Sequence, residues 1–332
     1  MDGRVDTLVA ELKAAGEPTR LRLLALLSVG DLTVKDLTTI LGQSQPRISR
    51  HLKLLTEAGL IDRFPEGAFA YYRLADRGEA ADTLARALVA RLDPSDPVLS
   101  ADRARLENAR RVHQEAAQRY FATNAESWDS IRALHAADER VERAMRSALG
   151  ETPFRTLVDL GTGTGRILEL FADLYQRGVG IDASAPMLSV ARTNLARAGL
   201  AHAQVRQGDI YALGMPSGAA DVVVLHQVLH FLDDPGRAVA EAARLLTPGG
   251  RLMIVDFAPH DLEFLRDAHQ HRRLGFSRGQ IAGWTGAAGL VMERIEDFPP
   301  DPGEQQKLTV TLWLARDPRV LMAAASDRTE TA

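Results

Sequence analysis

The sequence predicts a multi-domain fold: a mostly helical N-terminal domain with a β-hairpin, followed by an α/β domain with a largely parallel sheet. Residues 1–75 carry short helical patterns that end in an alternating, hairpin-like segment. The segment DPSDPVLS at 93–100 breaks helices with its two prolines and indicates a linker. From Phe154 onward, short β-branched runs alternate with helical patterns, which is typical of a parallel sheet flanked by helices.

Composition excludes several classes of protein. The chain has 332 residues, of which 45% are hydrophobic and 25% charged, as in an ordinary globular protein. No apolar run reaches the roughly 18 residues that a membrane helix needs, and the N-terminus lacks a secretion signal, so we expect a cytoplasmic protein with no membrane partner. The absence of cysteine excludes disulfides, thiolate metal ligands and cysteine nucleophiles. The net charge of -4 means that any contact with DNA needs a local basic patch.

Two helices open the N-terminal domain. The segment EPT at 17–19 starts the first helix with proline in its first turn, and Leu21, Leu24 and Leu27 form its buried face. The second helix covers TVKDLTTILG and ends at Gly42, which suits a C-cap.

The third helix, SQPRISRHLKLL, has two contrasting faces. Ser44 is its expected N-cap, and Ile48, Leu52 and Leu55 form the inward stripe. The opposite face has no acidic residue and suits the major groove of DNA, where Arg and Gln read base edges while Ser and Lys hold phosphates. The predicted DNA-binding residues are Gln45, Arg47, Ser49, Arg50, His51 and Lys53.

A hairpin follows this helix. Residues 61–74, IDRFPEGAFAYYRL, alternate apolar and polar side chains around the turn PEG. Three helices followed by such a wing predict a winged helix-turn-helix, which favours DNA binding over the alternative of a solvated basic helix. A last helix at 76–91 aligns Leu84, Leu88 and Leu92, which suits either dimerisation or packing within the domain.

The run EPTRLRLLALLSVGDLTVKDLTTILGQSQPRISRHLKLLTEAGL resembles the ArsR/SmtB family of repressors, over nearly all of residues 5–92. The resemblance implies a homodimer, formed through the winged-helix domain, that binds double-stranded operator DNA. The segment matching DLTVKDL often carries metal-binding cysteines in that family, but Thr33 and Lys35 stand there in this chain. The helix DTLARALVARL also lacks the acids and histidines of the family's other metal site, so we expect no metal.

The C-terminal domain opens with a glycine loop. LVDLGTGTGRI places an apolar strand directly before three glycines, and a helical segment, RILELFADLY, follows them. Gly161 suits a tight turn, Gly163 lets the backbone approach a ligand, and Gly165 permits close helix packing. The pattern predicts a nucleotide-binding loop at the N-terminus of a helix.

Further landmarks follow this loop. The strand GVGIDAS ends in Asp182, whose carboxylate can accept bonds from both hydroxyls of a ribose. Met187 suits either an adenine face or the core, and RQGDIYAL places Asp209 and Ile210 just past another strand. DVVVLHQVLHFL and LLTPGGRLMIVDF supply a fourth and a fifth strand. VMERIEDFP and KLTVTLWLARD then predict an antiparallel pair that completes a seven-stranded sheet.

Together these landmarks resemble the class I S-adenosylmethionine-dependent methyltransferases, over residues 154–317. Nicotinamide binding is the runner-up, but GTGTG fits its fingerprint poorly. The resemblance implies a Rossmann-like fold and S-adenosylmethionine or S-adenosylhomocysteine as the ligand. Tyr120 and Trp128 resemble parts of the preceding lid helices, with an interdomain core as the alternative. The implied ligand contacts are Asp159, Gly161, Thr162, Gly163, Asp182, Ala183, Met187, Asp209, Ile210, His226, Tyr120 and Trp128.

No catalytic residue stands out. The [DN]PP[YF] motif of DNA and amine methyltransferases is missing after the fourth strand, and His226, His230 and His260 are the only candidates for a base. On a helix, the i, i+2 spacing of His269 and His271 would place their rings on different sides.

The chain as a whole resembles fused regulators that respond to S-adenosylhomocysteine and control genes of the methionine cycle. We predict a winged-helix domain at 1–92, a linker and helical lid at 93–150, a methyltransferase-like domain at 151–318 and a flexible tail at 319–332. The first hypothesis is a ligand-sensing repressor. The alternative is an active small-molecule methyltransferase that carries a DNA-binding domain, so whether the protein is an enzyme stays open.

Overall fold

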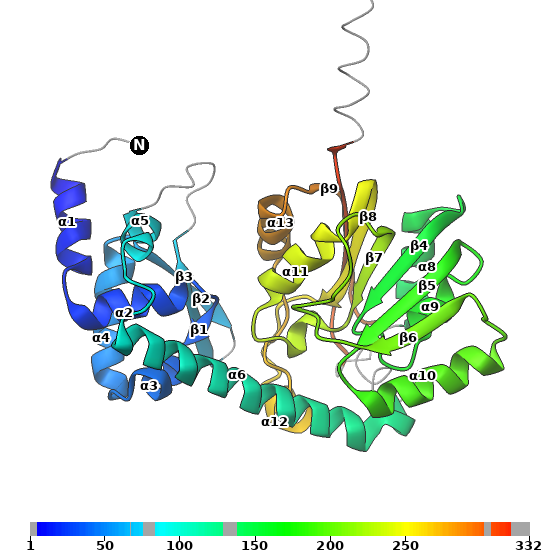
Figure 1. Ribbon diagram of the computed structural model, residues 1–332, viewed down its shortest axis with the longest axis horizontal. Helices are drawn as coiled ribbons and strands as arrows, with labels where there is room; N and C mark the ends of the chain where they lie inside the picture. Colours follow the sequence, from blue (N-terminus) through cyan, green and yellow to red (C-terminus); the bar gives the residue numbers. More distant parts are fainter. Residues whose placement is uncertain (1–4, 67, 76–83, 129–137, 302–306, 320–332) are drawn as a thin grey trace, which may run out of the picture. The chain divides into compact units, whose positions relative to one another are not determined.

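The computed structural model describes residues 5–66, 68–75, 84–128, 138–301 and 307–319. The chain divides into two compact units, Met1–Glu115 and Ala116–Ala332 (Figure 1). Within the described ranges, no helix is long and apolar enough to cross a membrane.

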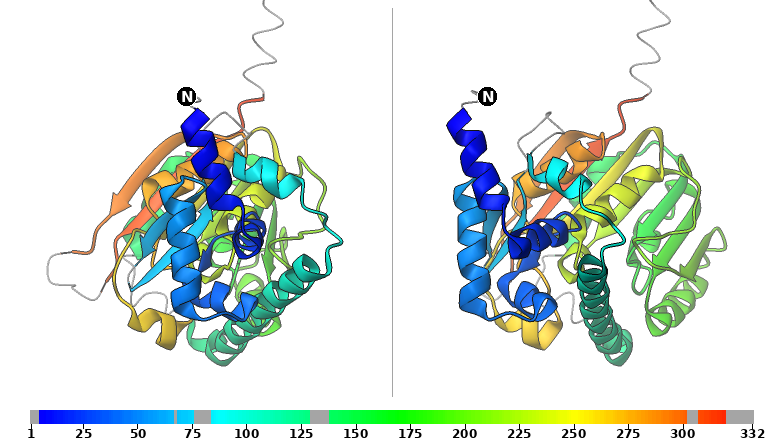
Figure 2. Two further views of the ribbon diagram at one scale, coloured as in Figure 1. Left: turned by 90° about the vertical axis from the view of Figure 1, so that its left-hand side faces the viewer. Right: turned by 60° about the vertical axis from the view of Figure 1, so that its left-hand side comes forward.

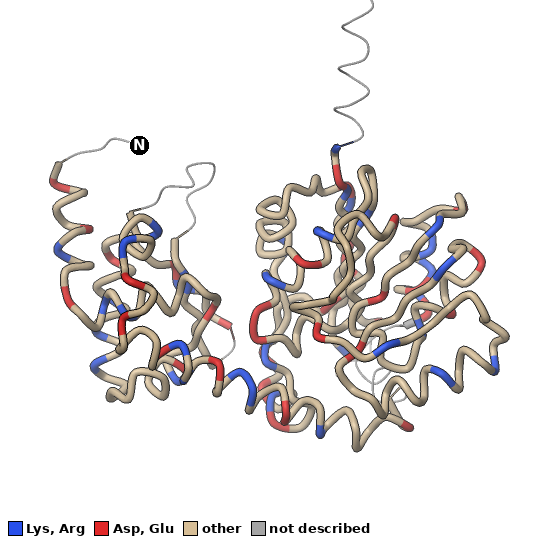
Figure 3. The backbone as a smooth tube through the Cα atoms, viewed as in Figure 1, with Lys and Arg blue, Asp and Glu red and all other residues tan. Residues whose placement is uncertain are grey.

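The N-terminal unit is a winged helix. A three-stranded antiparallel sheet of order β1-β3-β2 stands beside the helices. Both basic and acidic residues are scattered along the chain of this unit (Figure 3). Its elements are α1 Val5–Ala15, α2 Pro18–Leu27, β1 Leu32–Thr33, α3 Val34–Leu41, α4 Gln45–Glu57, β2 Ile61–Glu66, β3 Phe69–Leu74, α5 Leu84–Ala90 and the start of α6 Pro97–Asn124.

Local signals explain where these helices begin and end. The Glu17 side chain accepts a bond from the backbone N–H of Arg20 and caps α2. Thr33 and Asp36 form a reciprocal capping box at the start of α3, and Gly42 ends that helix with φ 63°. Ser44 stands at the N-cap of α4 as expected, although its side chain makes no capping bond.

The predicted elements of this unit are present with shifted ends. Ile48, Leu52 and Leu55 of α4 are fully buried, as the stripe predicted. The wing turn lies later than the predicted PEG turn, because the ladder between β2 and β3 continues to the Glu66–Phe69 pair. Of the helix predicted at 76–91, the first part lies outside the described residues.

Two expectations concern the end of this unit. Leu84 and Leu88 of α5 pack against the core of the unit, which supports the alternative of packing within the domain. Helix α6 begins at Pro97, inside the segment predicted to break helices. Proline is compatible with the first turn of a helix, and Asp96 caps this one by accepting bonds from the N–H groups of Val98 and Leu99.

The C-terminal unit is built on the predicted seven-stranded sheet. The strand order is β6-β5-β4-β7-β8-β10-β9, and β10 runs antiparallel to both of its neighbours. Its elements after α6 are η1 Ala125–Ser127, α8 Asp138–Leu149, β4 Phe154–Leu160, α9 Arg166–Leu170, β5 Tyr175–Asp182, α10 Ala185–Arg197, β6 Ala203–Gln207, β7 Ala220–His226, η2 Leu229–Phe231, α11 Pro235–Arg244, β8 Leu246–Phe257, α12 Phe264–His269, α13 Arg278–Ala287, β9 Val291–Phe298 and β10 Val310–Arg316.

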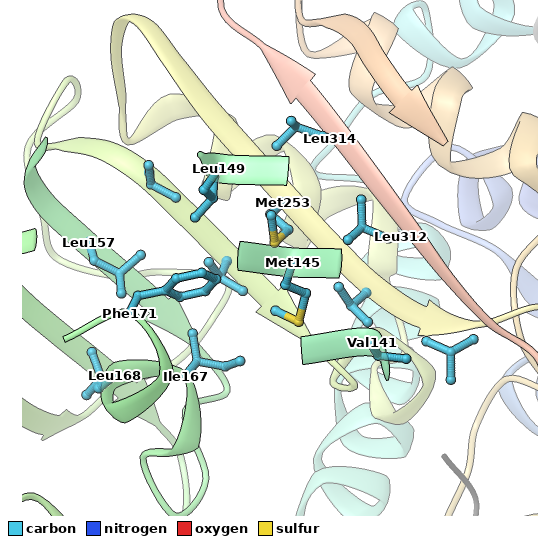
Figure 4. Close-up of a cluster of buried hydrophobic side chains, with 14 of the residues drawn as sticks. Val141, Met145, Leu149, Leu157, Ile167, Leu168, Phe171, Met253, Leu312 and Leu314 are labelled. Carbon is cyan, nitrogen blue, oxygen red and sulfur yellow. The ribbon is translucent and has the colours of Figure 1, made fainter. Parts of the chain in front are cut away.

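A separate apolar core covers each face of this sheet. On one face, Met145 and its neighbours on α8 lie against Met253 of β8 and Leu312 of β10 (Figure 4). On the other face, α11 and α13 pack on the same strands through residues such as Val239 and Ile281 (Figure 2). Strands buried on both sides explain why β4, β7 and β8 read as continuous apolar runs.

The helix after the glycine loop is shorter than RILELFADLY predicted. Helix α9 ends at Leu170, and β5 already begins at Tyr175. Phe171 and Tyr175 are buried in the core, and the backbone N–H of Phe154 donates to the carbonyl of Leu174 at 2.8 Å. Burial and strand pairing therefore override the helical pattern of this segment.

Candidate functional site

The glycine loop joins the ends of three neighbouring strands. Gly161, Gly163 and Gly165 have φ of 75°, 52° and 89°, in the left-handed region that favours glycine. The Gly161 N–H donates to the carbonyl of Ile181 on β5 at 2.8 Å. A Cβ atom on Gly161 would lie 2.4 Å from Cγ2 of Val228, just past β7, so no larger residue fits this turn.

Asp182, at the end of β5, is tied to the glycine loop. Its carboxylate accepts bonds from the backbone N–H of Gly163 at 2.9 Å and of Ser184 at 2.8 Å. Burial raises the pKa of the Asp182 carboxyl above its usual value, and these N–H donors oppose the shift. Each carboxylate oxygen accepts one of these two bonds and keeps lone-pair capacity for a ligand hydroxyl.

Two bulky side chains stand over Gly163. A Cβ atom on this glycine would lie 3.5 Å from Cε of Met187 and 3.6 Å from Nε1 of Trp128. Met187 is buried at the start of α10, where Ser184 caps the helix. Residues far apart in sequence therefore converge on this backbone position.

The other sequence-predicted ligand contacts lie on or beside the same strand ends. Asp159 and Thr162 are buried at the end of β4 and in the turn, and His226 is buried at the end of β7. Asp209 is exposed after β6, and its carboxylate accepts a bond from the N–H of Tyr211 at 2.9 Å. The carbonyl of Ala183 accepts a bond from the Gln207 amide, and Ile210 packs at the margin of a core cluster.

Tyr120 and Trp128 belong to one cluster of aromatic rings, which we call the aromatic cluster: Tyr120, Phe121, Trp128, Phe231 and His269. Phe121 contacts Phe231 at 4.8 Å and Trp128 at 5.1 Å between ring centroids. The Tyr120 hydroxyl hydrogen bonds to Nδ1 of His269 at 2.7 Å, and burial raises the pKa of this tyrosine. Through Trp128, the cluster reaches the glycine loop.

These residues fit an adenosyl ligand. The Thr162 hydroxyl oxygen is buried without a hydrogen-bond partner among the described residues. The three left-handed glycines have no side chains, so a ligand can approach the backbone of the loop. The Asp182 carboxylate can accept further hydrogen bonds from ligand hydroxyls. The bound group would supply an electrophilic methyl on a sulfonium, which the protein itself lacks.

A buried imidazole–carboxylate pair lies at the same edge of the sheet. His230 Nδ1 is 2.7 Å from Asp256 Oδ1, and both side chains are at most 3% exposed. Sequence reasoning named His230 only as one of three histidines and missed Asp256, because 26 residues separate the two. The only signal in the sequence for this role of Asp256 was the presence of a charged residue near the end of the apolar strand MIVDF.

Three further histidines, His260, His269 and His271, lie near this pair. Helix α12 ends at His269, where Gln270 with φ 59° reverses the chain, so His269 and His271 lie with ring centroids 6.5 Å apart. The prediction that these rings separate on a helix was wrong for this reason. Burial, with His230 nearby, lowers the pKa of His260 to about 4. Among the described residues, no group of three or more His, Cys, Asp or Glu is placed to hold a metal ion.

In the N-terminal unit, α4 presents the predicted DNA-binding face. Gln45, Arg47, Ser49, Arg50 and Lys53 are exposed on it. His51 differs, because its side chain is only 13% exposed and lies 3.7 Å from the Glu17 carboxylate. Burial lowers the pKa of His51 and nearby arginines add to this effect, although Glu17 opposes it. A neutral His51 is therefore a poor phosphate ligand at neutral pH.

Comparison with known proteins agrees with both units. A model described as "Methyltransferase domain" matches residues 158–254, and one described as "Bacterial regulatory protein, arsR family" matches residues 17–63. The demethylmenaquinone methyltransferase of Thermus thermophilus is 34% identical over 162 residues, which cover 47% of this chain and 73% of that protein. The chain belongs to the methyltransferase family and carries an arsR-family DNA-binding domain.

Further relatives differ in how much they share. The arsenical resistance operon repressor of Escherichia coli is 51% identical over 63 residues, and this match covers 19% of this chain and 54% of that repressor. The crystal structure of the YcgJ protein from Bacillus subtilis is similar to the methyltransferase domain with a TM-score of 0.47 and 19% identity, over 54% of this chain and 98% of that one. The methyltransferase fold implies binding of S-adenosylmethionine.

Proposed function

We propose that the protein is a homodimeric DNA-binding regulator whose methyltransferase domain takes S-adenosylmethionine or S-adenosylhomocysteine as an effector. The ligand is held by the glycine loop, Asp182 and the aromatic cluster. Its binding changes the affinity of the arsR-family domain for operator DNA, which is a coupling between two sites. The exposed basic face of α4 supports the DNA-binding half of this proposal.

Helix α6 is the observation that carries the coupling. It runs from Pro97 to Asn124, so its first part belongs to the N-terminal unit and its last part to the C-terminal unit. The last part carries Tyr120 of the aromatic cluster, at the expected ligand. A ligand that reorders these rings therefore acts on a helix whose other part belongs to the DNA-binding unit.

The first part of α6 is firmly held in that unit. Asp102 is buried and accepts bonds from Arg22 of α2 at 2.6 and 2.7 Å. Arg105 donates both to Asp102 and to the carbonyl of Ile40 on α3, the helix that packs against α4. Bidentate arginine–carboxylate bonds fix orientation as well as distance.

The direct test is operator binding with and without each nucleotide. The full-length protein selects its preferred duplex from a random-sequence pool, and fluorescence anisotropy then measures Kd for that duplex. We expect one nucleotide to change Kd by about fivefold or more, the lower end of ordinary allosteric coupling. Equal Kd without ligand and with both nucleotides would contradict the proposal. As a control, Arg50→Ala should weaken DNA binding and leave nucleotide binding unchanged.

Methyl transfer to a small molecule is the second candidate function. The observation that favours it is the buried His230–Asp256 pair at the carboxyl ends of β7 and β8. The two functions are compatible, because both require the same nucleotide. Turnover of S-adenosylmethionine with an acceptor, abolished by replacement of Asp182, would establish it.

A further inference from the structure

The His230–Asp256 pair has the geometry of an oriented base. Asp256 also accepts bonds from the backbone N–H groups of Leu229 at 3.0 Å and Phe257 at 2.8 Å. The Asp256 carboxylate accepts these two bonds, and His230 Nδ1 donates a third hydrogen bond to it. This arrangement selects the tautomer in which Nε2 of His230 keeps its lone pair and can take a proton.

The pair stands beside the glycine loop. Val228, two residues before His230, is the side chain that closes against Gly161. The His230 ring lies 4.0 Å from the ring of Phe231, which lies 6.2 Å from Trp128 above Gly163. A base at this edge of the sheet is therefore next to the place where the methyl donor is expected.

Gln227 provides a second, independent observation in the same loop. It has φ 50°, a conformation that residues other than glycine rarely adopt, and its backbone N–H donates to Val255 at 2.7 Å. Its side chain is buried, and Nε2 has no hydrogen-bond partner among the described residues. Buried amides are nearly always bonded, and strained residues gather at functional sites, so this amide is suited to a ligand oxygen.

We propose that His230, Asp256 and Gln227 form a methyl-acceptor site for a phenolic hydroxyl. The proposal rests on the adenosyl ligand of the proposed function. A histidine base matches a phenol, whose pKa is about 10, far better than an aliphatic alcohol. The rings of Phe231 and Trp128 offer edges and faces for an aromatic acceptor.

The transfer balances with these groups alone and the methyl donor. The phenolic oxygen forms a bond to the methyl carbon, and the carbon–sulfur bond breaks with its electron pair on sulfur, which yields S-adenosylhomocysteine. The phenolic proton moves to His230 Nε2, and Asp256 stabilises the resulting imidazolium. The Gln227 amide donates to the developing phenolate. Because His230 is buried, the acceptor reaches its ring only when the neighbouring ring of Phe231 or His271 turns aside.

The test uses 4-nitrophenol as the probe, because its phenolate and phenol forms absorb at different wavelengths. Full-length protein is saturated with S-adenosylhomocysteine, so that no methyl is transferred, at a pH where the free probe is mostly protonated. We expect a saturable phenolate band with the wild-type protein. His230→Gln should abolish the band, and Asp256→Asn and Gln227→Leu should each weaken it at least tenfold in apparent affinity.

Two controls separate the outcomes. His202→Gln changes an exposed histidine that hydrogen bonds to the carbonyl of Ala172 and contacts the ring of Tyr175, and it should keep the full band. If His230→Gln does not fold, the isosteric Asp256→Asn variant provides the test of the imidazole–carboxylate pair instead. Calorimetry with S-adenosylhomocysteine alone tests the nucleotide site, and absence of binding there would overturn the proposed function. A wild-type protein without a saturable band, or a band that survives in both His230→Gln and Asp256→Asn, overturns the acceptor site.

Discussion

At the residue scale, Asp182 is the residue on which the proposed nucleotide site depends most. Its carboxylate accepts bonds from Gly163 in the glycine loop and from Ser184 at the start of α10, and we propose that it also binds the ribose hydroxyls. A partly buried carboxylate of this kind gains charge-assisted bonds from a ligand, each worth about 1.5–3 kcal/mol. The same burial raises its pKa, so its charge is sensitive to pH.

Replacement of this carboxylate should weaken nucleotide binding. We expect Asp182→Ala to raise the Kd for S-adenosylhomocysteine by about 100-fold, or about 2.7 kcal/mol, measured by calorimetry. Asp173→Ala is the matched control, because Asp173 lies in an exposed pair with Arg146, and it should leave Kd unchanged. An Asp182→Ala protein that binds as tightly as the wild type would contradict this assignment.

The raised pKa of Asp182 also predicts a direction with pH. Ribose hydroxyls donate to the ionised carboxylate, and the protonated form loses acceptor capacity. As the pH falls, affinity for S-adenosylhomocysteine should therefore decrease when the Asp182 carboxylate becomes protonated. Because its pKa is raised, this should occur at a pH above the ordinary aspartate value of about 3.9. Calorimetry across this range should find no such drop in Asp182→Ala.

At the scale of elements, the ion pairs of Asp102 with Arg22 and Arg105, which we call the clasp, hold α6 against α2 in the DNA-binding unit. Asp102 is 1% exposed, so its charge depends on Arg22 and Arg105 for compensation. Removal of one residue of a buried ion pair lowers the free energy of unfolding by about 3–5 kcal/mol when the remaining charge has no other partner. Arg105 is half exposed and remains as a second partner, which reduces the effect.

Removal of one clasp residue should loosen α6 locally. We expect Arg22→Ala to lower the free energy of unfolding of the N-terminal unit by about 2 kcal/mol, measured by denaturant unfolding. Amide hydrogen exchange should speed up in the first part of α6. Arg111→Ala breaks an exposed pair with Glu115 on the same helix, so it should cost no more than about 0.5 kcal/mol. Equal effects of the two variants would exclude a structural clasp.

At the scale of the whole molecule, two units that match different families share one helix. The first unit matches arsR-family regulators and the second matches methyltransferases. Their boundary falls between Glu115 and Ala116, inside α6. Covalent helix continuity is the one structural link that the proposed coupling requires.

Interruption of that helix should separate binding from regulation. We expect the double variant Glu115→Gly, Ala116→Gly, which weakens the helix by about 1 kcal/mol at each position, to bind operator and S-adenosylhomocysteine with nearly wild-type affinity. The change in operator Kd caused by the nucleotide should fall below about twofold, measured by anisotropy. Glu115→Ala keeps the helix and should retain the coupling. Coupling that persists in the double glycine variant would show that α6 does not carry it.

Much of the fold was predictable because its signals are local. The glycines of the turn, the alternation of the wing and the apolar runs of the sheet each occupy a few consecutive residues. The predictions failed where distant contacts decide local structure. Phe171 and Tyr175 join the core rather than extend α9, and Gln270 turns the chain after His269.

By itself, the sequence determined that a winged helix precedes a nucleotide-binding α/β domain, and which face of α4 and which strand ends carry the polar groups. Periodicity and turn residues suffice for this, since they act within one element. Only the tertiary structure decided that His230 meets Asp256, that Trp128 stands over Gly163 and that α6 belongs to both units. Each of these depends on how separate segments pack, and no pattern within a segment specifies its partner across the sheet.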